Sequence, residues 1–229
     1  MKFFKKIFNI RPAEEWAWER MKLEFLVNNY NIMPKGVAHI GGWKCREVHT
    51  YKKIFGDIPI VFVEANKKLK PFIDENLKKY NKVRCEYVAL GNKNSQVFLN
   101  LNFSNPDNDD IGQSSSVLEP LLHPPIGTNK IEVEMTTADK LFKQDNIDFL
   151  SIDVQGYELE VLKGSKKLLN QINYIITEVN RTEQYKGCAL IDEIDEYLSR
   201  FGFLRMETEW WGGDADWGDA FYIKNELVN

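Results

Sequence analysis

Cysteine is scarce in this sequence: only three occur among 229 residues, and no two of them form a CxxC pair. Cys45, Cys85 and Cys188 are odd in number and far apart, a pattern that argues against a disulfide framework and against a zinc knuckle. The thiols are therefore expected to be reduced, as in a cytoplasmic protein.

Long hydrophobic runs and an excess of positive charge are also missing. No segment is long and apolar enough to span a bilayer, so stable membrane insertion is not expected. The formal net charge is −4, and no run of one sign has the length of a binding tail. Nucleic acid is therefore not expected as a partner, while the oligomeric state is left open.

The N-terminal segment reads MKFFKKIFNI and lacks the uninterrupted apolar core of a signal peptide. Two interpretations stand, a short basic helix that touches a membrane and a helix packed on the domain, and the second is preferred. Residues 13–30 continue with helical spacing until an Asn-rich stretch and Pro34. We therefore divide the chain into an N-terminal helical appendage, residues 1–34, and one globular domain, residues 35–229.

Downstream of residue 35, strand patterns alternate with helical patterns. Continuous apolar runs such as residues 58–65 are typical of strands covered on both faces. Strands are expected at residues 36–40, 58–65, 83–90, 95–103, 130–135, 147–153, 173–179, 203–211 and 220–225, and helices at 46–55, 67–80, 137–142, 157–169 and 190–201. Repeated strand–helix units predict an α/β fold with a parallel sheet and right-handed crossovers.

Two segments depart from this alternation. Residues 104–129 are rich in Asn, Asp, Ser and Pro and show no periodicity, so a long loop is expected there. The last two strands follow each other across a turn-rich segment with no helix between them. This pattern predicts an antiparallel hairpin at one edge of the sheet.

Polar residues stand where several of the predicted strands end. A single acid in such a position is usually only solvated. Ligands of open α/β sheets bind outside the carboxyl ends of the strands, so several polar groups at one edge indicate a site. The residues concerned are Asp153, Glu64, His39 with Gly41, and Glu178 with Asn180.

Glu64 has the most specific position of these residues. It lies 23 residues after Gly41, close to the spacing at which an acid accepts hydrogen bonds from the hydroxyl groups of a ribose. The turn after the first strand reads HIGGWK and is no GxGxxG, because Trp43 and Cys45 stand where small residues would let the backbone approach a pyrophosphate. A nucleoside without phosphates is therefore favoured over a dinucleotide.

Seven segments, in this order, resemble the FkbM family of S-adenosylmethionine-dependent methyltransferases. The resemblance runs from about residue 35 to residue 225, and its most distinctive block is IDVQGYELEVLKG. It implies a Rossmann-like sheet of seven strands, mostly parallel, with an antiparallel C-terminal hairpin and helices on both faces. The segments are GVAHIGGWKCREV, VFVEAN, VALGN, IDFLSIDVQGYELEVLKG, IITEVN, YKGCALIDEIDEYLSRFGF and WGDAFYIKN.

The resemblance also implies an activity and a set of contacts. The activity is O-methylation, often of a sugar hydroxyl in a glycan or a glycosylated metabolite, with S-adenosylmethionine as the cofactor and a carbohydrate as the acceptor. Trp43 and Cys45 depart from the family's first turn, which usually has smaller or more polar residues there. The implied contacts are His39, Gly41 and Gly42 with the methionine part of the cofactor, Glu64 and Asn66 with the ribose, Gly91 with the adenine, and Asp153 with the methyl group and substrate.

Methyl transfer to a hydroxyl group requires alignment of the oxygen with the sulfonium methyl carbon and removal of a proton. Asp153 is the first candidate for the base, and Glu178 is the other catalytic candidate, because its like charge nearby would raise the pKa of Asp153. Alternatively, Asp153, Glu178 and Asn180 are three oxygen ligands suited to Mg²⁺, which would acidify a bound hydroxyl directly. The sequence leaves these two roles open.

Two other classes of function remain as alternatives. Trp43 and Cys45 are compatible with a degenerate, non-catalytic module that binds S-adenosylmethionine or a glycan. A nucleotide-binding enzyme of another kind, such as a dehydrogenase, is disfavoured by the missing GxGxxG.

Overall fold

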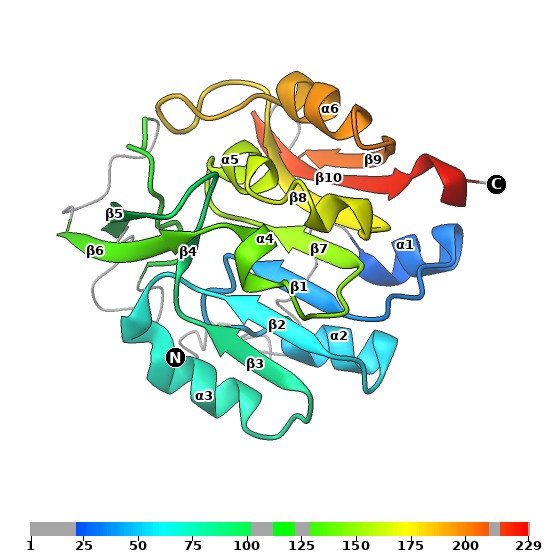
Figure 1. Ribbon diagram of the computed structural model, residues 1–229, viewed down its shortest axis with the longest axis horizontal. Coiled ribbons are helices and arrows are strands. Elements are labelled where there is room, and N and C mark those ends of the chain that lie inside the picture. The colour runs from blue at the N-terminus through cyan, green and yellow to red at the C-terminus, as the bar shows by residue number, and fades with distance from the viewer. Residues whose placement is uncertain (1–21, 102–111, 122–128, 211–215, 229) are drawn as a thin grey trace, which may run out of the picture.

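The computed structural model describes residues 22–101, 112–121, 129–210 and 216–228 (Figure 1). Residues 1–21 of the predicted N-terminal appendage, most of the loop predicted at 104–129, and Trp211 lie outside the described residues.

Seven strands form the main sheet, in the order β3-β2-β1-β7-β8-β10-β9 (Figure 1). The pairs from β3 to β8 are parallel, whereas β10 runs antiparallel to both β8 and β9. The predicted Rossmann-like α/β fold with its C-terminal hairpin is thereby confirmed. The strands span Val37–Ile40 (β1), Ile60–Val63 (β2), Val83–Glu86 (β3), Phe149–Ile152 (β7), Tyr174–Asn180 (β8), Phe203–Trp210 (β9) and Trp217–Lys224 (β10).

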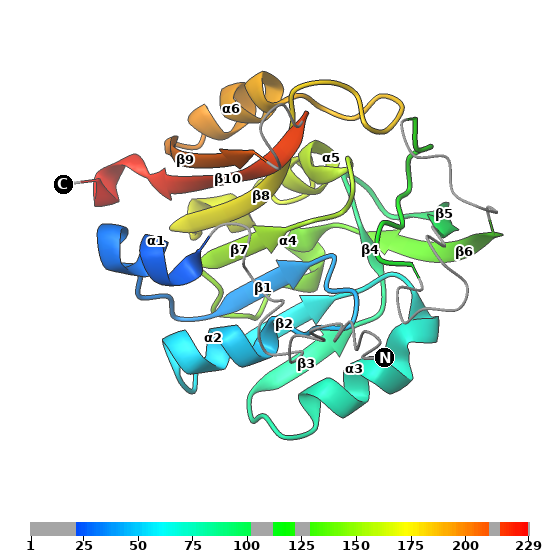
Figure 2. The same ribbon diagram turned by 180° about the vertical axis from the view of Figure 1, so that it is seen from behind.

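Helices cover both faces of this sheet (Figures 1 and 2). One face packs against α4, α5 and α6, and the other against α1, α2 and α3, so that each face has its own hydrophobic core. Strands β1, β2, β7 and β8 are buried along their whole lengths, which explains their continuous apolar sequences. The helices span Leu23–Tyr30 (α1), Val48–Phe55 (α2), Lys70–Leu77 (α3), Ala138–Leu141 (α4), Glu158–Lys163 (α5) and Ile191–Ser199 (α6).

A second sheet has three strands in the order β4-β6-β5, with bounds Ala89–Leu90, Asn129–Thr136 and Ser95–Leu101. The predicted single strand over 83–90 is therefore split, because β3 joins the main sheet and β4 pairs with β6. The alternating pattern of residues 95–101 fits this position, since Leu99 is buried while Phe98 is exposed. The small sheet extends beyond the carboxyl end of the main sheet and forms one wall of the site (Figure 1).

Several helices are shorter than their predicted ranges. The helix expected at 157–169 ends at Lys163 with Gly164 as its C-cap. A Cβ atom on Gly164 would lie 2.0 Å from the carbonyl oxygen of Gly91, so this close approach of two backbones requires glycine. Helix α1 is the described part of the N-terminal segment, and its Leu23 and Leu26 are buried in the core shared with α2. The boundary after residue 34 stays a prediction.

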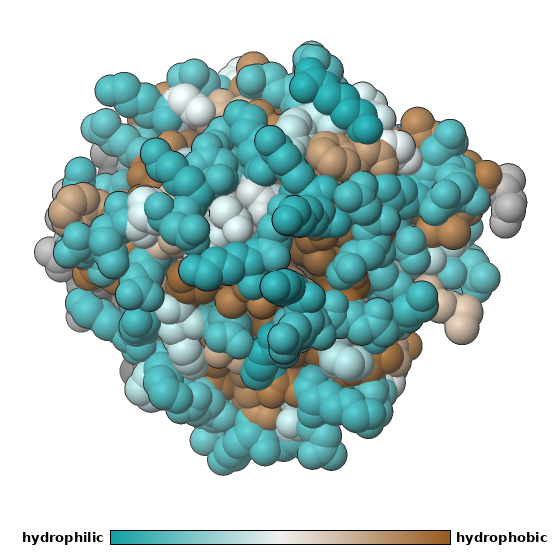
Figure 3. All heavy atoms as spheres, in the orientation of Figure 1, coloured by the Kyte–Doolittle hydropathy of each residue, from teal (hydrophilic) through white to brown (hydrophobic). Residues whose placement is uncertain are grey.

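Hydrophilic side chains cover most of the face seen in Figure 3, and hydrophobic residues are visible mainly between them. Within the described ranges, no helix has the length and apolar character needed to cross a bilayer. Cys45, Cys85 and Cys188 are free cysteines.

Candidate functional site

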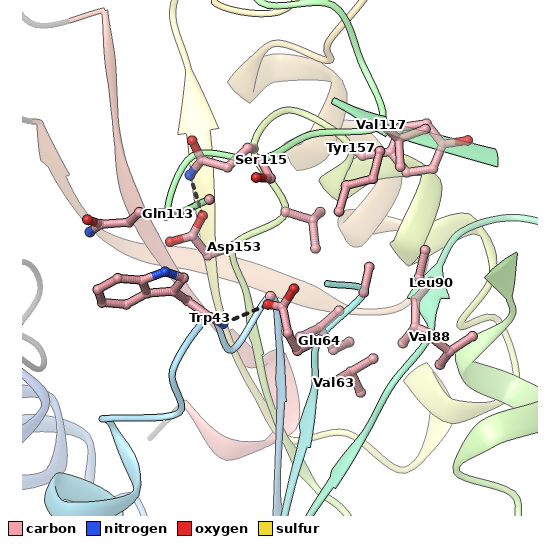
Figure 4. A pocket seen from close by; sticks show the side chains of 18 residues that line it. Trp43, Val63, Glu64, Val88, Leu90, Gln113, Ser115, Val117, Asp153 and Tyr157 are labelled. Atoms are coloured by element: carbon pink, nitrogen blue, oxygen red, sulfur yellow. Dashed lines mark hydrogen bonds between the residues drawn. The ribbon is translucent and has the colours of Figure 1, made fainter. Parts of the chain in front are cut away.

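A cavity opens at the carboxyl ends of β1, β2 and β7, where the strand order reverses direction between β1 and β7. The space between its lining residues, open solvent included, is about 580 Å³. The cavity has two chemically different ends with Glu64 between them (Figure 4). Trp43, Gln113 and Asp153 lie at the polar end, and Val88, Leu90, Val117 and Tyr157 at the apolar end (Figure 4).

Glu64 follows β2 directly, and its carboxylate is held by backbone donors. The N–H of Trp43 donates to Oε2 at 2.8 Å (Figure 4). The N–H of Asn66 donates to Oε1 at 2.6 Å. Burial is the main cause that raises the pKa of Glu64 to about 7, and the negative charge of Asp153 acts in the same direction. The N–H donors lower this pKa but do not outweigh the burial. The protein thus holds a carboxylate in the middle of the cavity whose charge changes near neutral pH.

The turn after β1 brings the two halves of the site together. The N–H of Gly41 donates to the carbonyl oxygen of Val63 at 2.9 Å, and a Cβ atom on Gly41 would lie 1.7 Å from the carbonyl oxygen of Asp153. Gly41 also has a φ of 90°, so only glycine fits this position without displacing β7.

Trp43 and Cys45, which depart from the small residues expected in this turn, both adopt the left-handed region, with φ of 44° and 55°. Such conformations cost a non-glycine residue about 1 kcal/mol and cluster at functional sites. The Trp43 indole lines the cavity, whereas Cys45 is fully buried, with Sγ 3.1 Å from a Cβ built on Gly42. Neither residue fills the cavity.

The apolar end of the cavity is formed largely by the small sheet and the segments next to it. Ala89 and Leu99 belong to the core of this sheet, and Val117 and Tyr157 pack against it. A flat, mostly apolar group fits such walls by burying its faces.

At the polar end, one amide joins Asp153 to a second acid, the buried Glu178, which does not line the cavity. Nε2 of Gln155 donates to Asp153 Oδ1 at 2.6 Å and to Glu178 Oε2 at 2.9 Å. Oε1 of Gln155 accepts a hydrogen bond from the hydroxyl of Tyr185 at 2.6 Å. The amide therefore connects the ends of β7 and β8.

Glu158, at the start of α5, is a third acid in this region. Its Oε1 accepts hydrogen bonds from the N–H groups of Val154 and Gly156, at 3.0 and 3.1 Å. Burial is the main cause that raises its pKa to about 7, and Asp153 contributes in the same direction. The turn between β7 and α5 is thus built around a buried carboxyl group.

One carboxylate oxygen from each of Asp153, Glu158 and Glu178 lies within 4.8 Å of the others, so these acids could hold a metal ion. Asn180, predicted as the third ligand with Asp153 and Glu178, is fully buried, and neither of its side-chain polar atoms has a hydrogen-bond partner among the described residues. The oxygen-rich donor set would suit Mg²⁺, but Gln155 already bridges two of the acids.

Of the predicted cofactor contacts, Gly41, Glu64 and Asp153 line the cavity. The other four, His39, Gly42, Asn66 and Gly91, are not among the residues that line it. His39 is buried with Nδ1 3.0 Å from the Tyr51 hydroxyl, and burial lowers its pKa. Their roles stay predictions.

Each of the other three residues, Gly42, Asn66 and Gly91, makes contacts within the protein itself. The N–H of Gly42 donates to Val63 O at 3.0 Å, and the Asn66 side chain accepts from the N–H of Lys68 at 3.2 Å. A Cβ on Gly91 would lie 2.5 Å from Sδ of Met135, so this glycine permits close packing of β4 against β6.

Gln155 and Glu158 were not found from the sequence, although both follow Asp153 within five residues. The only signal was Gly156, because a glycine after a strand end often marks a turn with positive φ. Its φ is 95°, and that of Gln155 is 57°. The conformation of this turn brings the side chains of Gln155 and Glu158 close to Asp153. Sequence periodicity carries no information about turn conformation.

Three comparisons with known proteins agree with this architecture. A family model described as the Methyltransferase FkbM domain matches residues 36–205. The chain is 26% identical over 149 residues to 2-O-methyltransferase NoeI of Sinorhizobium fredii (strain NBRC 101917 / NGR234), a match that covers 62% of this chain and 61% of that protein. The chain thus spans less than two thirds of the length of that relative.

Among solved structures, the fold is similar to magnesium protoporphyrin IX methyltransferase from Synechocystis PCC 6803. The form with bound SAM matches with a TM-score of 0.50 at 11% identity, over 88% of this chain and 76% of that chain. The form with bound SAH also has a TM-score of 0.50, at 10% identity, over 88% of this chain and 80% of that chain. The family match covers most of the chain, and the resemblance seen in the seven segments is confirmed: the protein belongs to the FkbM methyltransferase family.

Proposed function

We propose that this protein transfers the methyl group of S-adenosylmethionine to a hydroxyl group of a sugar, in a glycan or a glycosylated metabolite. The observation that carries the proposal is the cavity with Glu64 at its centre, Asp153 at its polar end and apolar walls opposite (Figure 4). The similarity to a 2-O-methyltransferase supports transfer to oxygen.

The cavity fits the three parts of the proposed cofactor in order. The apolar end, with Leu90, Val117 and Tyr157, suits the faces of an adenine ring. Glu64 accepts hydrogen bonds from the ribose hydroxyls, because its oxygens keep acceptor capacity beyond the bonds from Trp43 and Asn66. The methionine part then extends past Gly41 toward the acids.

Asp153 is proposed as the general base, as a residue at the end of β7 that lines the cavity. The cofactor supplies a methyl group on a positively charged sulfur. The acceptor oxygen forms a bond to the methyl carbon while the carbon–sulfur bond breaks, its electron pair stays on sulfur, and the hydroxyl proton passes to Asp153. The protein holds the two reactants in line and provides the proton acceptor.

A sugar is the proposed acceptor because carboxylates, which accept hydrogen bonds from hydroxyl groups, gather beside Asp153, the acid that lines the polar end of the cavity. Glu178 and Asp219 are paired in register on β8 and β10, and both are buried. With Asp153 they place three carboxylates on neighbouring parts of one sheet edge. Several acceptors close together suit a molecule with several hydroxyl groups.

Calorimetric titration with S-adenosylhomocysteine, S-adenosylmethionine and NAD is the first test. We expect micromolar binding of the first two and none of NAD. Turnover is then measured as S-adenosylhomocysteine formation in the presence of sugar acceptors, with and without EDTA and Mg²⁺. Binding without turnover on any acceptor would instead support the non-catalytic alternative, and tight NAD binding would contradict the proposal.

A further inference from the structure

Within the described part of the chain, Gln155 donates hydrogen bonds to both acids at the ends of β7 and β8. Its Nε2 carries two hydrogens, and both are directed to carboxylates, one to Asp153 at 2.6 Å and one to Glu178 at 2.9 Å. Tyr185 donates to Oε1 at 2.6 Å. Every polar atom of this side chain is thus engaged.

The orientation of the amide follows from its neighbours. A carboxylate can only accept hydrogen bonds, so the nitrogen end of Gln155 faces Asp153 and Glu178. The oxygen end then faces Tyr185, whose hydroxyl acts as donor. The buried Tyr185 hydroxyl therefore keeps the amide from turning over.

The backbone of Gln155 is strained in order to place this amide. Its φ of 57° lies in the left-handed region, which long side chains rarely adopt. The carbonyl oxygen of Gln155 accepts a hydrogen bond from the Ser116 hydroxyl at 2.7 Å. Gly156 follows with φ 95°, and a Cβ there would lie 2.9 Å from the Tyr185 ring. Contacts on both sides hold the unusual conformation, as is typical of functional positions.

Asp153 and Glu178 are close enough to bond the same nitrogen atom, and two carboxylates at such a distance repel each other. A positive charge or hydrogen-bond donors placed between them reduce this repulsion. Divalent cations and N–H groups are the usual solutions. Here the amide of Gln155 supplies two such N–H groups, and its bond to Asp153 is made at Oδ1. The direction of the other carboxylate oxygen is thereby set by a hydrogen bond to its neighbour.

We propose that Gln155 is a positioning residue for methyl transfer: its amide takes the place of a divalent cation between Asp153 and Glu178 and sets the direction in which Asp153 meets the acceptor hydroxyl. The inference rests on the proposed function for its role in catalysis. Its structural half, the replacement of a cation by an amide, is testable without turnover.

The variant Gln155→Glu has the same length and replaces the two N–H donors with a third carboxylate. In this variant kcat should fall about 100-fold with S-adenosylhomocysteine affinity nearly unchanged, because only the orientation of the acid is lost. Added Mn²⁺ should restore part of kcat in the variant and have no effect on the wild type, which should also retain its activity in EDTA. Gln171→Glu, whose Nε2 bonds Ile147 O at the opposite end of β7, is the control for the added charge.

Calorimetric titration of the proteins alone with Mn²⁺ separates this inference from the proposed function. We expect Gln155→Glu to bind the ion and the wild type not to bind it. Wild-type binding of Mn²⁺ at this edge, or wild-type activity that is lost in EDTA and regained with Mg²⁺, would overturn the inference and leave methyl transfer intact. Absence of turnover on every acceptor would instead defeat the proposed function, and the titration would still decide the role of the amide.

A second variant guards against misfolding of the first. Tyr185→Phe keeps the aromatic ring against Gly156 but removes the hydroxyl that fixes the amide. We expect kcat to fall about 10-fold with unchanged S-adenosylhomocysteine affinity. Equal kcat in Tyr185→Phe and wild type, together with equal kcat in Gln155→Glu, would overturn the proposal.

Discussion

The site contains two kinds of acid that are held in different ways. Glu64 is fixed by the N–H groups of Trp43 and Asn66, which belong to the backbone of the neighbouring turns. Asp153 is fixed by the side chain of Gln155, which itself depends on Tyr185. Backbone donors fix the position of a carboxylate whatever side chains surround it, which suits a binding contact. A carboxylate held by a side chain can be repositioned by substitution of that one residue, which suits a catalytic group.

The sharpest test of this comparison is Asp153→Asn. An asparagine keeps an oxygen that can accept from Gln155 but cannot take a proton at neutral pH. We expect kcat to fall about 1,000-fold or more while S-adenosylhomocysteine affinity changes less than about threefold. Steady-state kinetics with calorimetry measures both, and normal turnover would refute the assignment of the base.

Glu64→Gln should have the opposite signature. An amide nitrogen would face one of the two backbone N–H donors, and the ribose would lose an acceptor, so S-adenosylhomocysteine affinity should fall about 10- to 100-fold. The matched control is Glu86→Gln at the end of the neighbouring strand β3, outside the residues that line the cavity. A smaller loss for Glu64→Gln than for Glu86→Gln would contradict the role of Glu64.

The affinity for S-adenosylhomocysteine should also depend on pH through the same residue. The pKa of Glu64 is raised to about 7, so the carboxylate is ionised above that pH and becomes protonated as pH falls below it. Affinity should therefore decrease below about pH 7, by at most about tenfold per pH unit, and the dependence should vanish in Glu64→Gln. A flat wild-type profile in calorimetry at several pH values would show that Glu64 does not hold the ligand.

The variant Glu158→Gln tests how much the buried charge of Glu158 lowers the free energy of unfolding. Its pKa of about 7 lies above the ordinary value of 4.5, so between these values the folded state binds more protons and wild-type stability decreases as pH rises. Glutamine avoids this loss and keeps an oxygen for the N–H groups of Val154 and Gly156. The variant should be more stable by about 1 to 3 kcal/mol at pH 8 and nearly equal to wild type below pH 4.5.

Denaturant unfolding at both pH values measures this difference. Lower stability of Glu158→Gln at pH 8 would mean that the charge of Glu158 stabilises the turn.

The smallest effect is expected for Ser116→Ala. Its hydroxyl donates to the carbonyl of Gln155 at 2.7 Å and accepts from the N–H of Leu118 at 3.0 Å. Loss of these bonds should lower kcat about 3- to 10-fold through Gln155 and leave S-adenosylhomocysteine affinity nearly unchanged. Ser95→Ala is the control, because that buried hydroxyl has no partner among the described residues. Equal kinetics for both variants would show that Ser116 does not support Gln155.

Much of the main sheet could be predicted because its patterns are local. Continuous apolar runs mark the buried strands β1, β2, β7 and β8, and helical periodicity marks the helices between them. The order of the seven motifs identifies the family. The small sheet could not be assigned in this way. Strand β6, which ends at residue 136, pairs with β4, which begins at residue 89, and with β5. An alternating sequence does not show which sheet a strand joins, because it fits equally well at the edge of either one.

The sequence by itself determined that Glu64, Asp153 and Glu178 would end up at one edge, since the carboxyl ends of parallel strands meet there. Which groups hold each acid depends on contacts between segments that are distant in the sequence. Gln155 reaches two carboxylates because its backbone adopts a positive φ and because Tyr185, 30 residues away, orients its amide. Hydrogen bonds between distant segments depend on turn geometry, and that geometry is set by packing, which periodicity in the sequence does not encode.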